Sequence, residues 1–342
     1  MNFASDNAYG AAPEMFDALR TANEGAVPSY GEDLLTTRLE ADLARIFERE
    51  IAVFPVITGT AANALALSTL APPHGAIFCH RDAHIATDEC GAPEVFTQGA
   101  KLVTLEGAHG KLSPDTLEEA ISRFAVGSVH HSQPAAVSIT QASEMGTCYR
   151  PDEVCAISSV AKRHGMKLHM DGARLANAIA FLGCPPAEIT WRAGVDALSF
   201  GMTKNGAFAA EAVLIFTRED ARDFEFRRKR FGHLISKMRF VSAQLLCGIE
   251  KGRWLNWAQT ANRLACVLAE RLAAVPAVEI VHPVQANLVF ASMPEPLRRK
   301  LRVAGAMFYD WGPCGDGRRL GRFVTSFATP ERDIDRLFAA CA

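Results

Sequence analysis

Residues 168–205 read LHMDGARLANAIAFLGCPPAEITWRAGVDALSFGMTKN, and two short apolar runs in this region end beside chemically reactive side chains. The run 166–170 stops at Asp171, and the run 195–200 is followed by Thr203 and Lys204. Both runs are typical of buried strands. Because ligands of open α/β sheets bind at the carboxyl ends of strands, the sequence predicts that Asp171 and Lys204 face the same cleft.

An acid and a lysine in one cleft are the two groups that pyridoxal phosphate (PLP) requires of a protein. The lysine forms the Schiff base, and the acid pairs with the protonated pyridine nitrogen so that the ring acts as an electron sink. A surface lysine and an aspartate that caps a helix are the simpler alternative. The rest of the chain decides between the two interpretations.

The composition is that of an ordinary enzyme with a sizeable core. The chain has 342 residues, enough for two domains, with 49% hydrophobic and 22% charged residues. A net charge of −2 gives no reason to expect nucleic acid or an anionic membrane as a partner. Nine scattered cysteines without a CxxC pair, no signal peptide and no long apolar run predict a cytoplasmic protein with reduced thiols and no metal site.

Strand-like and helical segments alternate along the first two thirds of the chain. Strands are predicted at 52–57, 76–79, 101–105, 135–140, 166–170, 195–200 and 212–216. This alternation predicts an α/β fold with a parallel or mixed sheet and helices on both faces. We also expect Gly165 to end the helix that starts at Pro151.

The pattern changes after about residue 240. A long helix is predicted at 254–275, followed by short strands at 278–281, 287–290 and 322–327 and by a last helix that begins at Thr329-Pro330. This part is expected to form a smaller α+β domain. The predicted division is an N-terminal segment 1–14 that reaches the active site, a large PLP-binding domain 15–240 and a small domain 241–342.

A candidate phosphate site lies between the first strand and the next helix. Thr58-Gly59-Thr60 offers backbone N–H groups at a helix start together with small hydroxyl side chains, which is the composition of an anion site. An ordinary capped helix is the alternative.

Histidines and arginines near strand ends are candidates for proton transfer and for carboxylate binding. His84 follows the second strand, where it could stack on the cofactor ring or act as a base. His130 and His131 precede the fourth strand, and this position favours them less. Arg174 could reach the cofactor phenolate or a substrate carboxylate. Arg322, from the small domain, could close over the same carboxylate, and a solvated arginine is the alternative.

With these residues placed, the chain resembles the fold-type I PLP enzymes, and specifically the low-specificity L-threonine aldolases, over nearly its whole length. The segments that carry the resemblance are Phe3-Ala-Ser-Asp-Asn7, Tyr30-Gly-Glu-Asp33, Gly59-Thr-Ala-Ala-Asn63, Ala83-His84, Thr87-Asp-Glu-Cys-Gly-Ala-Pro-Glu94, Ile139-Thr-Gln141, His169-Met-Asp-Gly-Ala-Arg174 and Thr203-Lys-Asn-Gly206. Their common order is far more specific than any one of them. The resemblance implies a mostly parallel seven-stranded sheet between helices in the large domain.

The resemblance also implies a role for each matching residue. It makes Lys204 the Schiff-base lysine, Asp171 the partner of the pyridine nitrogen, and His84 and His130 the two active-site histidines. It implies cofactor contacts for Thr58, Gly59, Thr60, His84, Gln141, Arg174 and Thr203. It implies substrate contacts for Ser5, Tyr30, Arg174, Lys229 and Arg322, with Lys229 reaching toward a neighbouring site.

One stretch departs from the family pattern. Many relatives have Glu-Asn-Thr-His after the fourth strand, whereas this chain has Thr140-Gln141-Ala142-Ser143. The chain therefore resembles a bacterial branch that lacks this acid and histidine. The departure leaves open the route of the proton and the preference at Cβ, without changing the reaction class.

The implied reaction is the PLP-dependent retro-aldol cleavage of L-threonine, L-allo-threonine and other L-β-hydroxy-α-amino acids to glycine and an aldehyde. The implied assembly is a homodimer or homotetramer with active sites at the subunit interface. Alternatives within PLP chemistry are β-elimination, transamination and the cleavage of phenylserine. A non-catalytic PLP-fold binding protein is a further alternative, against which the intact Lys204, Asp171 and His84 argue. A nicotinamide-dependent oxidoreductase is poorly supported because no GxGxxG follows the first strand.

Overall fold

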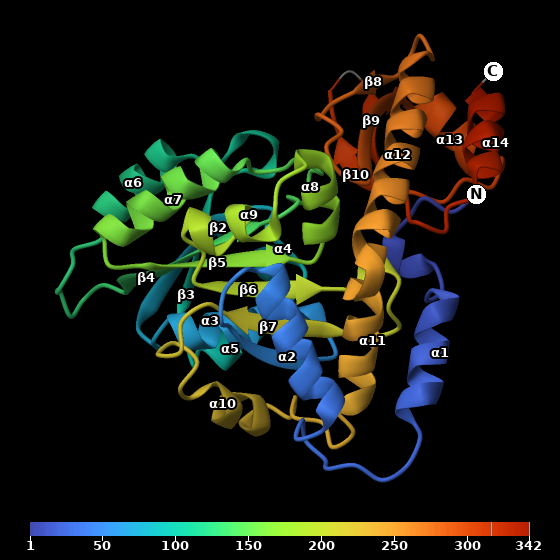
Figure 1. Ribbon diagram of the computed structural model, residues 1–342. Coiled ribbons are helices and arrows are strands. Elements are labelled where there is room, and N and C mark those ends of the chain that lie inside the picture. Colours follow the sequence, from blue (N-terminus) through green and yellow to red (C-terminus); the bar gives the residue numbers. More distant parts are fainter. Residues whose placement is uncertain (316, 342) are drawn as a thin grey trace.

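The computed structural model describes residues 1–315 and 317–341 and contains two sheets (Figure 1). The larger sheet has seven strands in the order β1-β7-β6-β5-β4-β2-β3. Its strands are β1 (Ala52–Val56), β2 (Gly75–His80), β3 (Lys101–Leu105), β4 (Gln133–Thr140), β5 (Lys167–Gly172), β6 (Ala197–Gly201) and β7 (Glu211–Ile215). Five neighbouring strands, β3, β2, β4, β5 and β6, pair in parallel, and β7 is antiparallel to both β6 and β1, so β1 points the same way as those five. The predicted α/β fold with a mostly parallel seven-stranded sheet is confirmed.

Helices cover both faces of this sheet, as Figure 1 shows. One face is covered by α1 (Pro13–Ala22), α2 (Leu34–Ile46), α6 (Pro114–Ser122), α7 (Pro151–Arg163), α8 (Leu175–Leu182), α9 (Pro186–Ile189) and α11 (Arg239–Ile249). The other is covered by α3 (Gly59–Leu70), α4 (His84–Thr87), α5 (Ala92–Phe96) and α10 (Phe224–Arg230). Strands β2, β6 and β7 are buried along their whole length because both faces are covered.

Local sequence signals set several helix ends. Thr58 accepts a hydrogen bond from Ala61 N and so caps α3. Gly165 follows α7 with a φ of 66°, which glycine adopts without strain, and this confirms its predicted position at the helix end. The chain also contains five short 3₁₀ helices among the described residues: η1 (Asp6–Ala8), η2 (Ala108–Gly110), η3 (Trp191–Ala193), η4 (Thr203–Asn205) and η5 (Glu250–Gly252).

The smaller sheet is antiparallel, with the order β10-β11-β9-β8. Its strands are β8 (Glu279–Ile280), β9 (Leu288–Pro294), β10 (Tyr309–Pro313) and β11 (Arg318–Val324), and α12 (Arg253–Ala273), α13 (Glu295–Val303) and α14 (Glu331–Cys341) accompany it. The predicted strand 322–327 starts four residues earlier in the structure, at Arg318. Strand β10 was not predicted because its sequence, YDWGP, is mostly exposed and has no apolar alternation.

The two cores meet along α12. Trp254 and Ala258 pack in the core of the large sheet, whereas Leu264, Leu268 and Leu272 pack against the small sheet. Phe3 also lies in the small-sheet core, so the N-terminal segment is fastened there. We propose that the structural boundary falls within α12. The division after residue 240 remains a prediction.

Candidate active site

A cavity of about 420 Å³ lies at the carboxyl ends of β5 and β6, between the two sheets. The predicted site residues that line it are Ser5, Gly59, His84, Asp171, Arg174, Lys204 and Arg322. The N-terminal segment, the starts of α3 and α4, the loops after β4 and β6, and strands β10 and β11 all contribute to its wall. The cleft predicted from the two strand ends is therefore present.

A larger groove of about 710 Å³ lies between α1, α2 and α11. Its wall combines apolar side chains such as Val27 and Leu34 with carboxylates such as Glu14 and Asp17. None of the predicted catalytic residues lines it. The smaller cavity is therefore the candidate active site, because it brings an amine, a carboxylate, an imidazole and two guanidinium groups together.

Lys204 and Asp171 form the centre of this cavity. Asp171 is 4% exposed, and its two oxygens accept hydrogen bonds from Ala173 N (2.9 Å) and Asn63 Nδ2 (2.8 Å). Burial raises the pKa of Asp171, but the charge of Lys204 and these hydrogen bonds outweigh burial and leave it below its ordinary value. Burial and the charge of Arg174 lower the pKa of Lys204. A lowered pKa makes the amine of Lys204 more available as a nucleophile.

His84 is held by a carboxylate that the sequence did not single out. Its Nδ1 lies 2.8 Å from Glu89 Oε1, and Asn63 Nδ2 donates to the same oxygen at 2.8 Å. The side chain of Glu89 is fully buried. The hydrogen bond to Glu89 raises the pKa of His84. With Nδ1 engaged, Nε2 is the nitrogen of His84 that is free to reach the cavity.

The two predicted arginines converge on the cavity from different parts of the chain. Arg174 donates from Nε to Asp6 Oδ2 at 2.7 Å and from Nη2 to Asp6 Oδ1 at 3.0 Å. The guanidinium of Arg322 lies 4.8 Å from the ring of Tyr309 and 4.9 Å from that of Trp311. Burial and the charge of Arg174 lower the pKa of Arg322 to about 10. Two cations held together are suited to a carboxylate ligand.

Asp6 is, after Glu89, the second residue of the site for which the sequence predicted no role. It lies in the Ser5-Asp6-Asn7 segment, and its side chain is almost fully buried against Arg174 and Asn287. Burial raises the pKa of Asp6, but the charges of Arg174 and Lys204 hold it below its ordinary value. Asp6 therefore fixes the orientation of Arg174. The two partners lie 168 positions apart, so only the fold brings them together.

The residues of the cavity fit PLP. Arg322 Nε is buried and has no hydrogen-bond partner among the described residues, as expected of a donor that awaits an anionic ligand. At the start of α3 the N–H groups of Gly59 and Thr60 have no intrahelical acceptors, and a Cβ added at Gly59 would meet no atom within 4 Å. This turn has the donors and the open space that a phosphate needs. Asp171 offers the carboxylate and Lys204 the amine.

Three predicted site residues do not reach the cavity. Gln141 is fully buried, and its amide donates to Tyr149 O and accepts from Tyr149 N, so its side chain is turned toward Tyr149 and does not line the cavity. The hydroxyl of Thr203 is engaged with the backbone of Ala210. His130 lies exposed in the turn before β4, at the amino end of that strand, whereas the cavity lies at the carboxyl ends of the strands. The order of residues along the chain predicts this amino end for His130, and the structure places it there, whereas the family resemblance implies a catalytic role.

Other predicted residues lie at the edge of the site or outside it. Thr58 uses its hydroxyl to cap α3, and Thr60 is partly exposed in the first turn of that helix. Tyr30 is half exposed, and the Nζ of Lys229 lies 5.0 Å from the centre of its ring. Neither Tyr30 nor Lys229 lines the cavity of its own chain. Their predicted contacts with substrate remain predictions, and the one for Lys229 involves a neighbouring site.

Glu211, the first residue of β7, is a further buried carboxyl beside Lys204. Its Oε1 accepts a hydrogen bond from Thr203 N at 3.2 Å, and burial raises its pKa to about 7. The folded protein thus holds this proton between pH 4.5, its usual pKa, and about pH 7, whereas the unfolded chain releases it. Stability that comes from this group is present below pH 4.5 and is lost as the pH rises through this window.

Glu211→Gln is therefore expected to stabilise the cofactor-free protein at pH 8 and to change it little at pH 4.5. The rise in the pKa of Glu211 from 4.5 to about 7 corresponds to roughly 3 kcal/mol in the free energy of unfolding at pH 8. Urea unfolding at both pH values measures the difference. Equal stability of the variant and the wild type at pH 8 would contradict the buried, proton-holding carboxyl.

The described part of the chain contains neither a membrane-spanning helix nor a metal-binding cluster. Within residues 1–315 and 317–341 none of the helices has the length and apolar character needed to cross a membrane. The same residues include no group of three or more His, Cys, Asp or Glu side chains placed to hold a metal ion.

Comparison with known proteins identifies several relatives. Residues 2–295 match the model of the beta-eliminating lyase family. A low specificity L-threonine aldolase of Pseudomonas sp. is 46% identical over 98% of this chain and 96% of its own. One from Pseudomonas aeruginosa is 46% identical over 98% and 94%. The solved structure of a Leishmania major threonine aldolase has a TM-score of 0.94 and 27% identity, covering 99% of this chain and 98% of its own.

Proposed function

The chain belongs to the beta-eliminating lyase family, and from this membership and the geometry of the cavity we propose that it is a PLP-dependent lyase that cleaves L-threonine and L-allo-threonine to glycine and acetaldehyde. The observation that carries the proposal is that the buried Asp171 and Lys204 line one cavity at the strand ends. PLP, when bound, supplies an acceptor for the electron pair that is released when the Cα–Cβ bond breaks. Asp171 provides the negative charge that keeps a ring nitrogen protonated.

Arg174, Arg322 and Ser5 are proposed to hold the substrate carboxylate. The two guanidinium groups come from the large and the small sheet, and Asp6 and the rings of Tyr309 and Trp311 fix their orientations. A carboxylate fixed at one end of the substrate determines which bond at Cα points away from the plane of the cofactor. The two arginines thus select the bond that breaks.

His84 is proposed to stack against the cofactor and to exchange protons at Nε2. Its Nδ1 is fixed by Glu89, which sets both the tautomer and the direction of the ring. A positioned histidine of this kind contributes to proton transfer in the transition state. The exposed His130 is not needed for this role within one chain.

The mouth of the cavity supports a range of β-hydroxy-α-amino acids. Tyr309 and Trp311 line it and are 51% and 36% exposed, so both present aromatic surface near the place of the β-substituent. Apolar contact with these rings favours aryl substituents such as that of phenylserine. We therefore include L-phenylserine among the expected substrates.

The reaction class is tested by product identity. The PLP-loaded protein is supplied with L-threonine, L-allo-threonine or D-threonine, and acetaldehyde and glycine are measured in each case. Acetaldehyde and glycine in equal amounts from the L isomers, and none from D-threonine, support the proposal. The formation of 2-oxobutanoate and ammonia would instead indicate β-elimination, and a keto acid without ammonia would indicate transamination.

We further propose a homodimer or homotetramer whose active sites lie at the subunit interface. Ile57 and Phe208, which lie close in sequence to Gly59 and Lys204 respectively, are 38% and 68% exposed, so each offers apolar surface for a second copy of the chain. A second copy that covers this surface would bring its own Lys229 toward the site. Mixing inactive Lys204→Ala and Lys229→Ala subunits should restore activity. If each variant alone is inactive and the mixture is also inactive, the active site does not contain residues of both subunits.

The cytoplasmic location remains a prediction from the sequence.

A further inference from the structure

The loop after β4 brings a carboxyl group into the cavity that the motifs did not reveal. The departure from the family pattern ends at Ser143, and the next residue, Glu144, lines the cavity together with Thr140. Glu144 Oε1 accepts hydrogen bonds from His84 N and Thr140 Oγ1, both at 2.9 Å. Its other oxygen, Oε2, is buried and has no hydrogen-bond partner among the described residues. One oxygen is anchored and the other is free.

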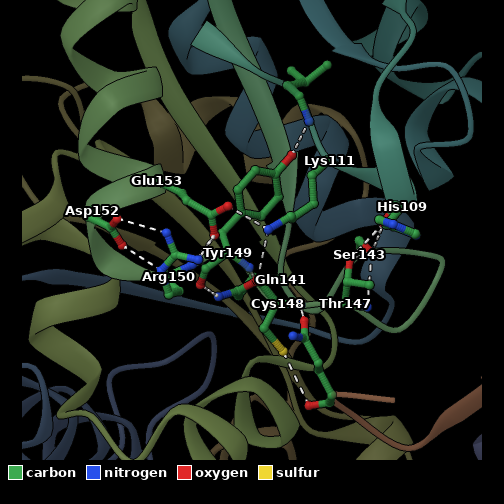
Figure 2. Close-up of polar contacts among 12 residues, drawn as sticks. His109, Lys111, Gln141, Ser143, Thr147, Cys148, Tyr149, Arg150, Asp152 and Glu153 are labelled. Atoms are coloured by element: carbon green, nitrogen blue, oxygen red, sulfur yellow. Dashed lines mark hydrogen bonds and ion pairs between the residues drawn. The ribbon is translucent and has the colours of Figure 1, made fainter. Parts of the chain in front are cut away.

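The backbone on either side of Glu144 is fixed by a network of hydrogen bonds (Figure 2). The hydroxyls of Ser143 and Thr147 both donate to the carbonyl of His109, at 3.2 and 2.7 Å. Ser143 N also donates to Thr147 O at 2.8 Å, which closes the turn. Glu144 lies within this closed turn, so the position of its carboxyl group is set before any ligand binds.

A second set of contacts ties the same loop to the segment before α6, and Figure 2 shows several of these residues. The amide of Gln141 is paired with the backbone of Tyr149, and the Oη of Tyr149 accepts from Leu112 N at 2.6 Å. Lys111 donates to Cys148 O at 3.4 Å. The loop is thus held from both ends.

The chemistry of the neighbouring histidine leaves a role for this carboxyl. The hydrogen bond from His84 to Glu89 raises the pKa of His84, so its ring carries a proton over more of the neutral range. While it is protonated, the imidazole can give up a proton at Nε2 but cannot take the proton of the substrate β-hydroxyl. Burial, reinforced by the charge of Asp171, raises the pKa of Glu144 to about 7, which suits a group that exchanges a proton near neutral pH.

Building on the proposed aldol cleavage, we propose that Glu144 is a catalytic residue whose free oxygen takes the proton of the substrate β-hydroxyl. The O–H bond breaks and its proton passes to Glu144 Oε2. The Cα–Cβ bond then breaks, the aldehyde C=O bond forms, and the electron pair of the broken bond stays with the glycine half. Glu144 returns its proton to solvent as the aldehyde leaves, and Cα takes up one proton, so the reaction is neutral overall.

A purely structural role for Glu144 is the alternative, because Oε1 anchors the first residue of α4. Glu144→Gln separates the two roles. Glutamine keeps an oxygen that accepts from His84 N and Thr140 Oγ1, and it places an NH₂ group, which cannot take a proton, where Oε2 was. Glu144→Ala removes both functions. Glu106→Gln is the matched control, because Glu106 is an exposed carboxylate paired with Arg81.

Three readouts are compared in the wild type and the variants. The first is kcat/KM for L-threonine in the PLP-loaded enzyme. The second is the exchange of the α-proton of glycine in D₂O, followed by NMR, a step in which no β-hydroxyl takes part. The third is the melting temperature of the cofactor-free protein, which reports the anchoring of α4 without any ligand.

Glu144→Gln is expected to lower kcat/KM by at least ~10²-fold while leaving glycine exchange and the melting temperature close to wild type. Glu144→Ala should also lower the melting temperature, and Glu106→Gln should change none of the three. Wild-type cleavage by Glu144→Gln overturns the proposal, as does an equal loss of cleavage and glycine exchange. A wild-type enzyme that exchanges glycine but forms no acetaldehyde would instead refute the proposed function.

Discussion

Lys204→Ala is expected to lose more than ~10⁴-fold of the rate of L-threonine cleavage, beyond what a single proton-transfer group supplies. Lys204 carries the only amine among the described residues that line the cavity, and its pKa is lowered by burial and by the charge of Arg174. Alanine removes the amine that is proposed to bind the cofactor covalently. The variant is therefore expected to lose the visible absorption band of lysine-bound PLP together with acetaldehyde formation.

The control for this experiment is Lys101→Ala, at the exposed start of β3. It removes a lysine without touching the cavity and should keep both the absorption band and the rate. A Lys204→Ala variant that retained the band would show that another lysine binds the cofactor. In that case the assignment of the centre would be wrong.

His84→Asn is expected to lower kcat/KM for L-threonine by ~10²–10⁴-fold, the usual contribution of a placed proton-transfer group. Asparagine neither titrates nor offers an aromatic face, so the variant loses both the proton at Nε2 and the proposed stacking. The backbone N–H of residue 84 still reaches Glu144, so α4 should keep its anchor. Steady-state kinetics measure the loss, and circular dichroism checks the fold.

His130→Asn is the matched comparison, because the family resemblance implied a catalytic role that the position of His130 in the structure does not support. This exposed histidine precedes β4 at the end of the sheet away from the cavity. The variant should keep the wild-type rate within about twofold. A large loss would mean that His130 serves the site of a neighbouring subunit. An unaffected His84→Asn variant would remove the histidine from the mechanism.

The elements of the large sheet were predictable because their signals are local. Each strand is an apolar run with a turn signal at its end, and Asp171, Lys204 and His84 lie where such runs stop. The carboxyl ends of parallel strands lie at one edge of the sheet. The positions where the apolar runs end were therefore enough to predict that these three groups lie at the same edge. Strand β10 carried no such signal, and it forms by pairing with β11.

The partners that position the site were not predictable in the same way. Asp6 meets Arg174 across 168 residues, and Asn63 meets Asp171 across 108, so each pair depends on the complete fold. Neither contact leaves a pattern in the residues between its members. Side-chain direction was equally hidden, as Gln141 shows. Its position after β4 matches a cofactor ligand, but its amide turns toward Tyr149.

Glu144 shows how a motif comparison can miss a group that the structure supplies. The segment Thr140–Ser143 contains no acid, whereas the turn that follows folds the next residue, Glu144, back into the cavity. The hydrogen bonds of Ser143 and Thr147 that close this turn involve His109, in another loop. Glu89 was missed in the same way. It lies in a segment that carried the resemblance, but only its hydrogen bond with His84 in the structure shows that it positions this histidine.

The most direct test of the account is to find which residue binds PLP. The purified protein is mixed with PLP, reduced with borohydride, digested, and analysed by peptide mass spectrometry. We expect the reduced cofactor on the peptide that contains Lys204, and we expect prior incubation with L-threonine to release acetaldehyde before trapping. Modification of a different lysine, or no stable modification at all, would contradict the assignment of this cavity as the catalytic centre.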